Sequence, residues 1–400
     1  MSRTTSLCLS LTSCLLLPVQ AQTLKTEIAA SQTASTVQVL YVIDGSTLTT
    51  YNVNSQTLNA SAVGTLTLPE TNSASITPSP NDHFVYYSAF DSGSLLNKHL
   101  WIYATDATGS PQGPPVQELN AIKFYGAPAF DPKANFLYQI TAAPAEGDEY
   151  ENYTIWRYLL NSTTGRITYP VAEAKYKLPS GAGGSEGCAL SIVGFNAAGN
   201  KMYDEISCGY PGGASATFNE RTVNLETGAL GSDVEVYGWN NSSGGGENVQ
   251  FANNLVFDLV TINDYQQGSN SVNIYPVQPN ASATPLVECT AAMLEACGYF
   301  SGLNLVDPSG KYVFLAISSG TTQIEKVEIG EHKIVDTSSY IPYTVEQLSP
   351  DGSIAYAVQE SYPGLTLEIY GFNLATGAVT PGGAIGIPSA IDPWFTAERY

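Results

Sequence analysis

The sequence predicts an all-β protein folded as a seven-bladed β-propeller, in which each blade is a sheet of four antiparallel strands. Three observations predict this fold. An alternating strand recurs seven times, a turn follows it at intervals of 47 to 63 residues, and the first blade lacks a strand that the end of the chain can supply. A repeat of this length that holds four strands is typical of a propeller blade.

The composition agrees with a β-rich, acidic protein. Only 13% of the 400 residues are charged, while 36 are glycine and 25 are tyrosine, which favours pleated strands and tight turns over helices. The formal net charge is −21, and such a field repels nucleic acid and anionic membrane surfaces. We therefore expect no nucleic-acid partner.

The N-terminus has the pattern of a secretory signal peptide. Arg3 precedes an apolar run from Leu7 to Leu17, and small residues lead to a cleavage site after Ala21. The apolar run is too short to span a bilayer as a helix, and no later stretch is long enough. We expect a signal peptide at 1–21, a flexible segment at 22–36 and a single propeller domain at 37–400, secreted or periplasmic. Cys14 ends a lipobox-like stretch, so a lipoprotein is the less favoured alternative.

The recurring strand changes sides with period two, which indicates a half-buried strand. Its seven copies are Thr47–Tyr51, His99–Tyr103, Thr154–Tyr158, Arg221–Asn224, Ser271–Tyr275, Ile324–Val327 and Leu367–Tyr370.

Two kinds of turn frame these strands. One is the Asp-Pro-Ser-Gly type, at 307–310 and again as Ser-Pro-Asp-Gly at 349–352. The other follows the alternating strand, and its sequence at 224–230 nearly repeats at 373–379. A glycine there supplies the positive φ of a tight hairpin. The corresponding positions are Gly109, Gly165, Gly228, Asn280 (the blade without a glycine), Gly330 and Gly377.

The chain ends predict how the ring closes. Blade one starts near 37–42 and has three strands, whereas the tail at 389–395 follows a complete seventh blade. We expect this tail to pair as the innermost strand of blade one, which removes an exposed sheet edge.

The Pro-Asp-Gly turns, the tyrosine-containing second strands and the Thr-Gly turns together resemble the lactonase-type seven-bladed propellers, which include 6-phosphogluconolactonase and the YVTN repeat proteins. The resemblance covers about residues 37 to 396. It implies the fold, and it implies a lactone-hydrolysing activity as one function to test. Because the motifs are structural turns, no catalytic residue of that family is carried over to this chain.

Four cysteines remain after the signal peptide, which predicts two disulfides in an exported protein. The turn at 196–199 lies midway between Cys188 and Cys208, as it would if they faced each other across a hairpin, so we pair Cys188 with Cys208 and Cys289 with Cys297. The cysteine and histidine spacings do not match a zinc site, and the acidic run at 146–151 does not match a calcium loop. No metal and no cofactor are predicted.

Long connections between second and third strands are expected at 90–98, 144–153, 208–220, 263–270 and 359–364, on one face of the ring. Long loops in a tight repeat are common sites of function. Their carboxylates and tyrosines suit sugar hydroxyls, a cation or a protein partner. The candidate ligand-face residues are Asp91, Asp148, Glu149, Tyr150, Tyr210, Asp264, Tyr265, Glu360 and Tyr362.

The leading functional hypothesis is an exported binding or scaffold module that uses this long-loop face to contact a protein or carbohydrate-like ligand. The alternative is a lactonase-like hydrolase that opens an unphosphorylated lactone at the mouth of the central channel, and the sequence leaves open whether the chain is an enzyme. We expect a monomer. Asn-x-Ser/Thr sites would carry glycans only in a eukaryotic secretory route. They lie at Asn59, Asn152, Asn161, Asn240, Asn241 and Asn280.

Overall fold

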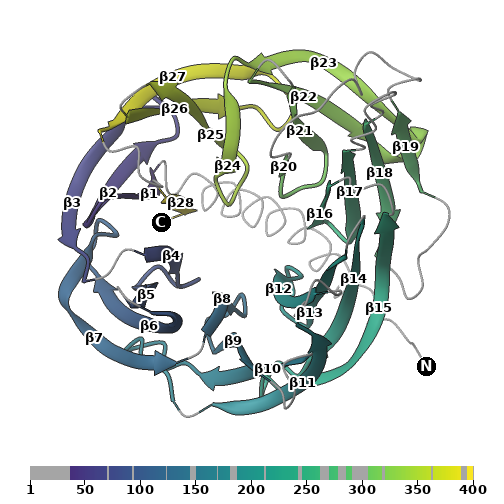
Figure 1. Cartoon of the computed structure of the whole chain (residues 1–400). Helices are drawn as coiled ribbons and strands as arrows, with labels where there is room; N and C mark the ends of the chain where they lie inside the picture. Colours follow the sequence, from purple (N-terminus) through teal and green to yellow (C-terminus); the bar gives the residue numbers. More distant parts are fainter. Residues whose placement is uncertain are drawn as a thin grey trace, which may run out of the picture.

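The computed structural model describes residues 37–399 except for 14 short stretches. These are 70–71, 92–93, 123, 145–149, 169, 181–186, 211–212, 242–245, 262–269, 278–284, 291–304, 318–319, 362–363 and 389–393. The described residues form seven four-stranded antiparallel sheets arranged in a ring around a central axis (Figure 1). This arrangement confirms the predicted seven-bladed β-propeller.

The first four blades are given from the innermost strand outward. Blade one holds β28 (Trp394–Arg399), β1 (Val37–Asp44), β2 (Thr47–Asn54) and β3 (Ala60–Thr67). Blade two holds β4 (Asn72–Pro78), β5 (Phe84–Asp91), β6 (Ser94–Thr105) and β7 (Pro111–Ile122). Blade three holds β8 (Phe124–Phe130), β9 (Phe136–Pro144), β10 (Tyr150–Leu159) and β11 (Val171–Pro179). Blade four holds β12 (Gly187–Phe195), β13 (Lys201–Tyr210), β14 (Gly213–Val223) and β15 (Leu230–Asn241).

The remaining three blades follow the same order. Blade five holds β16 (Gly246–Ala252), β17 (Leu255–Thr261), β18 (Asn270–Pro276) and β19 (Val287–Thr290). Blade six holds β20 (Leu305–Val306), β21 (Tyr312–Ile317), β22 (Thr321–Glu328) and β23 (Lys333–Ile341), with the 3₁₀ turn η3 (Ile329–Glu331) before β23. Blade seven holds β24 (Thr344–Leu348), β25 (Ile354–Ser361), β26 (Gly364–Phe372) and β27 (Val379–Ile387).

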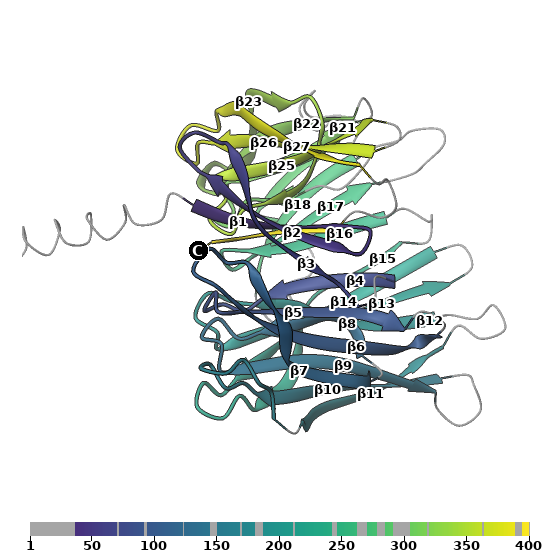
Figure 2. The ribbon, with the colours of Figure 1, turned by 90° about the vertical axis from the view of Figure 1, so that its left-hand side faces the viewer.

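The ring closes as predicted, through the C-terminal strand. β28 pairs antiparallel with β1, and Thr396 lies opposite Tyr41. Seen from the side, β28 lies beside β1 and β2 within the same blade (Figure 2). The closing strand begins at Trp394 rather than near 389, so the predicted segment overlaps it by only two residues.

The hydrophobic core lies between blades rather than within one central mass. Each of the seven clusters of buried apolar residues in the described part of the chain joins two neighbouring blades. Between blades two and three, for example, Phe84 and Tyr86 pack against Leu137 and Tyr158. Burying each such side chain contributes about 1.5 to 3 kcal/mol, so every junction stabilises the ring.

The first kind of predicted turn is held by a side chain at its start. The Asp307 carboxylate accepts hydrogen bonds from the backbone N–H groups of Lys311 and Tyr312, at 2.7 and 2.6 Å. In blade seven, Ser349 takes the same place, and its hydroxyl accepts from the N–H of Ile354 at 2.9 Å. Aspartate and serine recur here because each can accept the N–H groups that a tight turn leaves unpaired.

The second kind of turn follows the prediction at Gly109, Gly165, Gly228 and Gly377, which all have positive φ, whereas Asn280 of blade five lies outside the described residues. Gly228 and Gly377 adopt φ values of +70° and +74°. A Cβ at Gly228 would lie 2.7 Å from the ring of Phe136 in the preceding blade, so glycine is required for space as well as for φ. The assignment of this role to Gly330 is wrong, because Gly330 lies within η3 and His332 takes the positive φ of +53°. The 3₁₀ turn moves the left-handed position two residues later.

Four of the five connections predicted to be long are shorter than expected, and the one in blade five keeps its predicted length. β5 runs to Asp91 and β6 begins at Ser94, and β13 and β14 are likewise separated only by residues 211–212. Much of the predicted loop therefore extends the ladders, which satisfies backbone N–H and C=O groups that a loop would expose. The longer connections in this set are 145–149 and 262–269.

Candidate functional site

The predicted ligand-face residues fall into two groups. Asp148, Glu149, Asp264, Tyr265 and Tyr362 lie outside the described residues. Asp91, Tyr150, Tyr210 and Glu360 are placed by their backbone, at or near the ends of β5, β10, β13 and β25, and their side chains lie outside the described part. The long-loop face thus stays a prediction.

The first predicted disulfide is confirmed. Cys188 on β12 and Cys208 on β13 are direct partners in the ladder, 4.0 Å apart at Cα, and form a disulfide. The hairpin turn between them is the one that predicted the pairing. Cys297, half of the second predicted pair, lies outside the described residues.

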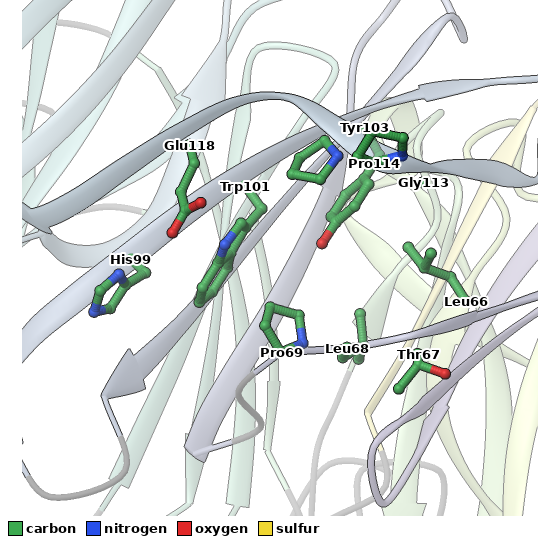
Figure 3. A pocket seen from close by; sticks show the side chains of 11 residues that line it. Leu66, Thr67, Leu68, Pro69, His99, Trp101, Tyr103, Gly113, Pro114 and Glu118 are labelled. Atoms are coloured by element: carbon green, nitrogen blue, oxygen red, sulfur yellow. The ribbon is translucent and has the colours of Figure 1, made fainter.

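A groove between blades one and two gathers polar and aromatic side chains. It has a volume of about 570 Å³ and lies between the end of β3 and the strands β6 and β7 (Figure 3). We call it the aromatic groove. Its lining comprises Leu66, Thr67, Leu68, Pro69, His99, Trp101, Tyr103, Gly113, Pro114, Pro115 and Glu118.

Strand alternation brings the aromatic side chains of β6 to this groove. His99, Trp101 and Tyr103 are two residues apart, so they project from the same face of the strand. Trp101 is 4% exposed and stacks on Tyr87 and His99, at centroid distances of 5.6 and 5.3 Å. The indole is thus held rigidly from within the protein, and His99 is the more accessible ring.

The outermost strand supplies the acidic group of the groove. Glu118 on β7 lies directly opposite Trp101 in the ladder, and its exposed carboxylate points toward the side of His99 and Trp101 (Figure 3). Among the ion pairs of the described residues, none includes Glu118. This carboxylate can therefore accept hydrogen bonds from a ligand.

Tyr103 completes the polar lining. Burial, and then the charge of Glu118, raise the pKa of Tyr103 to about 12. The phenol therefore stays protonated at neutral pH and can both donate and accept a hydrogen bond. Its hydroxyl points into the space bordered by Leu66 and Pro69 (Figure 3).

The innermost strands carry few charged residues. In the strands as bounded by the structure, these are Glu247, Glu346, Glu398 and Arg399. Arg399 pairs with Gln38 near the start of β1, at the end of the strand opposite the β1–β2 hairpin. Glu346 lies on β24, and burial raises the pKa of its carboxyl.

Sequence reasoning identified only part of the aromatic groove. The strand at 99–103 was predicted, and its alternation already placed His99, Trp101 and Tyr103 on one face. Glu118, Pro114 and Pro115 come from β7, and Pro69 comes from blade one. Their positions beside β6 depend on the strand register and on how the two blades pack. The Trp101–Glu118 pairing has no local sequence signal.

The fold defines the chain as a seven-bladed β-propeller, with a concave aromatic and acidic groove at one blade junction. No family model matches the sequence, and no curated protein matches it significantly. Among the described residues, no helix is long and apolar enough to cross a membrane.

Solved structures share this fold. The periplasmic gluconolactonase PpgL of Pseudomonas aeruginosa is similar, with a TM-score of 0.54 and 10% identity over 90% of this chain and 99% of that chain. A protein from Lactobacillus plantarum has a TM-score of 0.51 and 11% identity over the same shares of the two chains. The resemblance to lactonase-like propellers is therefore confirmed for the fold, and at these identities it says nothing further about activity.

Proposed function

We propose that this chain is an exported binding module that holds a carbohydrate-like ligand in the aromatic groove. The observation that carries the proposal is the exposed Glu118 carboxylate, without an ion-pair partner in the described chain, beside His99, Trp101 and Tyr103. Export is supported by the predicted signal peptide and by the Cys188–Cys208 disulfide, since disulfides persist in oxidising compartments.

A neutral polyhydroxyl ligand fits the mixture of groups in the groove. Glu118 offers two acceptor oxygens, and Tyr103 offers both a donor and an acceptor. Pro69 and Pro114 line the same groove and can contact the apolar faces of a sugar ring. The net charge of −21 disfavours an anionic ligand but leaves a neutral one unaffected.

The test is calorimetric titration of the purified mature chain with a panel of neutral saccharides. We expect at least one to bind, and Glu118→Ala to weaken that binding about tenfold, equivalent to about 1.4 kcal/mol. Glu118→Gln should retain most of the affinity, because an amide still hydrogen-bonds hydroxyls. The control is Glu226→Ala, which removes an exposed carboxylate from a tight turn of blade four.

Two results would contradict this proposal. One is that no saccharide binds, or that Glu118→Ala and Glu226→Ala bind it equally well. The other is that a simple amine binds in its place and that Glu118→Gln abolishes the binding, because a cation needs the carboxylate charge rather than a hydrogen-bond acceptor.

The second candidate is the lactonase-like hydrolase at the channel mouth. It is favoured by Glu346, a half-buried carboxyl on an innermost strand whose pKa burial raises, since such a group can act as a general acid or base. Hydrolysis of an unphosphorylated lactone by the mature chain, abolished in Glu346→Gln and kept in Glu226→Gln, would replace the binding proposal. The same assay with and without a chelator tests for a metal-dependent enzyme.

A further inference from the structure

A second groove, between blades two and three, repeats the geometry of the aromatic groove. Trp156 pairs with Gln139 across β9 and β10, at the register where Trp101 pairs with Tyr87 across β5 and β6. Each tryptophan is followed two residues later by a buried tyrosine, Tyr103 in blade two and Tyr158 in blade three. Equivalent positions in neighbouring blades therefore form walls of two neighbouring grooves.

The second groove is larger and its walls are mostly apolar. It has a volume of about 770 Å³ and lies between β7 of blade two and the strands β9 and β10 of blade three. Leu119 projects from β7, Ala143 and Trp156 come from blade three, and Ile167 and Pro170 precede β11. We call it the neutral groove, because no acidic or basic side chain lines it among the described residues.

The polar groups of this groove already have protein partners. The Trp156 indole N–H donates to the Thr141 hydroxyl at 2.8 Å. The Gln117 side-chain amide accepts a hydrogen bond from the N–H of Ile167 at 2.8 Å and donates one to the carbonyl of Ile167 at 3.2 Å. These two hydrogen bonds join blade two to blade three. The Thr168 hydroxyl donates to the carbonyl of Leu159 at 3.2 Å. A ligand is not needed to satisfy any of these groups.

The two tryptophans differ in what covers them. Trp101 is buried and stacked on Tyr87 and His99, whereas Trp156 is only partly buried. Among the ring contacts of the described residues, none involves Trp156. Its indole therefore offers an unstacked surface to the groove.

We propose that the neutral groove is a second ligand site, which takes a small neutral molecule with a planar apolar ring. Its volume lies in the range of about 300 to 1,000 Å³ that is usual for small-molecule sites. A charged ligand would lose its hydration there without gaining a charged partner, and the protein's field further repels anions. A planar ring can stack on Trp156, between walls that supply apolar contacts. The proposal is independent of the ligand of the aromatic groove.

The probe for this site is N-phenyl-1-naphthylamine, a neutral aromatic dye that fluoresces more strongly in apolar surroundings. We expect the purified mature chain to bind it saturably, at one dye per chain. Ala143→Trp fills the groove from blade three, because Ala143 alternates with Thr141, whose side chain contacts Trp156, and it should weaken binding at least tenfold. The matched control is Ala62→Trp, which adds the same ring at an exposed position on β3 and should leave binding unchanged.

Leu119→Trp fills the groove from the opposite wall, so the test does not depend on one variant folding correctly. Circular dichroism and the melting temperature select the variants that keep the native fold. The proposal is overturned if the native chain does not bind the dye saturably. It is also overturned if a Trp variant that keeps the native fold binds the dye as well as the native chain does. It is also overturned if light scattering shows a dimer that Ala143→Trp dissociates, since the groove would then hold a second copy of the chain.

Discussion

The Tyr138 hydroxyl of blade three donates a hydrogen bond to the carbonyl oxygen of Gly228 in blade four, at 2.6 Å and 90 residues further along the chain. Equivalent hydrogen bonds run from the Tyr41 hydroxyl to the Gly109 carbonyl and from the Tyr86 hydroxyl to the Gly165 carbonyl, at 2.7 and 2.5 Å. Each links the second strand of one blade to the tight turn of the next. The tyrosines and turn glycines that define the repeat are therefore partners of one another across blade junctions.

Removing one of these hydroxyls should destabilise the ring. Tyr138→Phe leaves the buried Gly228 carbonyl without this donor, so we expect the free energy of unfolding to fall by about 1 to 2 kcal/mol. The control is Tyr356→Phe in blade seven, because the buried Tyr356 hydroxyl has no hydrogen-bond partner among the described residues. That variant should be as stable as the native chain or more stable. Urea denaturation measures both, and equal losses would show that the hydroxyl bond contributes nothing.

Removing the closing strand should destabilise the whole ring. Truncation of residues 388–400 deletes β28 and exposes the β1 edge with its unpaired N–H and C=O groups. We expect a lower melting temperature and a greater tendency to aggregate, both measurable by calorimetry and light scattering. An unchanged melting temperature would mean that closure through β28 does not stabilise the protein.

Glu325 should make stability depend on pH. This fully buried side chain lies on β22, and burial, followed by the charge of Asp336, raises its pKa to about 8. The folded state therefore holds the proton more tightly than the unfolded state, whose pKa is near 4.5. The stability from this group is fully present below pH 4.5 and is lost as pH rises through 8.

Glu325→Gln removes this titration. Above pH 8 the variant should be more stable than the native chain by about 2 to 4 kcal/mol, and near pH 4 the two should be equal. Denaturation curves across this range measure the difference, with the exposed Glu226→Gln as the control. A stability difference that is the same at every pH would contradict the predicted titration.

The buried ion pair of blade four should be sensitive to loss of one partner. Arg221 Nε lies 2.7 Å from Asp204 Oδ2, and both side chains are at most 5% exposed. Arg221→Met leaves a buried carboxylate without its cation, so we expect a loss of about 3 to 5 kcal/mol in the free energy of unfolding.

A second substitution separates charge burial from packing. Replacing both partners, with Arg221→Met and Asp204→Leu, should recover most of the loss, because no buried charge remains. Lys326→Met, which breaks an exposed pair with Glu328, should have no measurable effect. If the double variant is no more stable than Arg221→Met, the loss comes from packing rather than from the unpaired charge.

The repeat could be predicted because its signals are local. A turn aspartate such as Asp307 and a turn glycine such as Gly228 each mark a backbone geometry within a few residues. His332 shows the limit, because a 3₁₀ turn displaced the left-handed position without a clear sequence signal. Leu58, a non-glycine residue with a φ of +58° in the corresponding turn of blade one, is a second such case.

The grooves could not be predicted because they depend on register and on packing between blades. Trp101 and Trp156 were both visible in alternating strands, and their shared register is clear only once the ladders are known. Glu118 joins Trp101 from another strand, and Pro69 arrives from another blade. The long-loop candidates such as Asp148 and Tyr265 lie outside the described residues, so the binding face that they define stays a prediction.

The pairing of β28 with β1 also constrains the order in which the chain can fold. Val39 is among the first residues of the ring to be synthesised, and its ladder partner Glu398 is among the last. Blades two to seven can each form from contiguous sequence, but blade one stays three-stranded until β28 has been synthesised. Bringing such distant segments together is slow, because the entropy of closing a long loop is lost before the contacts form. A nascent or prematurely terminated chain therefore presents an open β-edge, and that edge is where misassembly with another chain would begin.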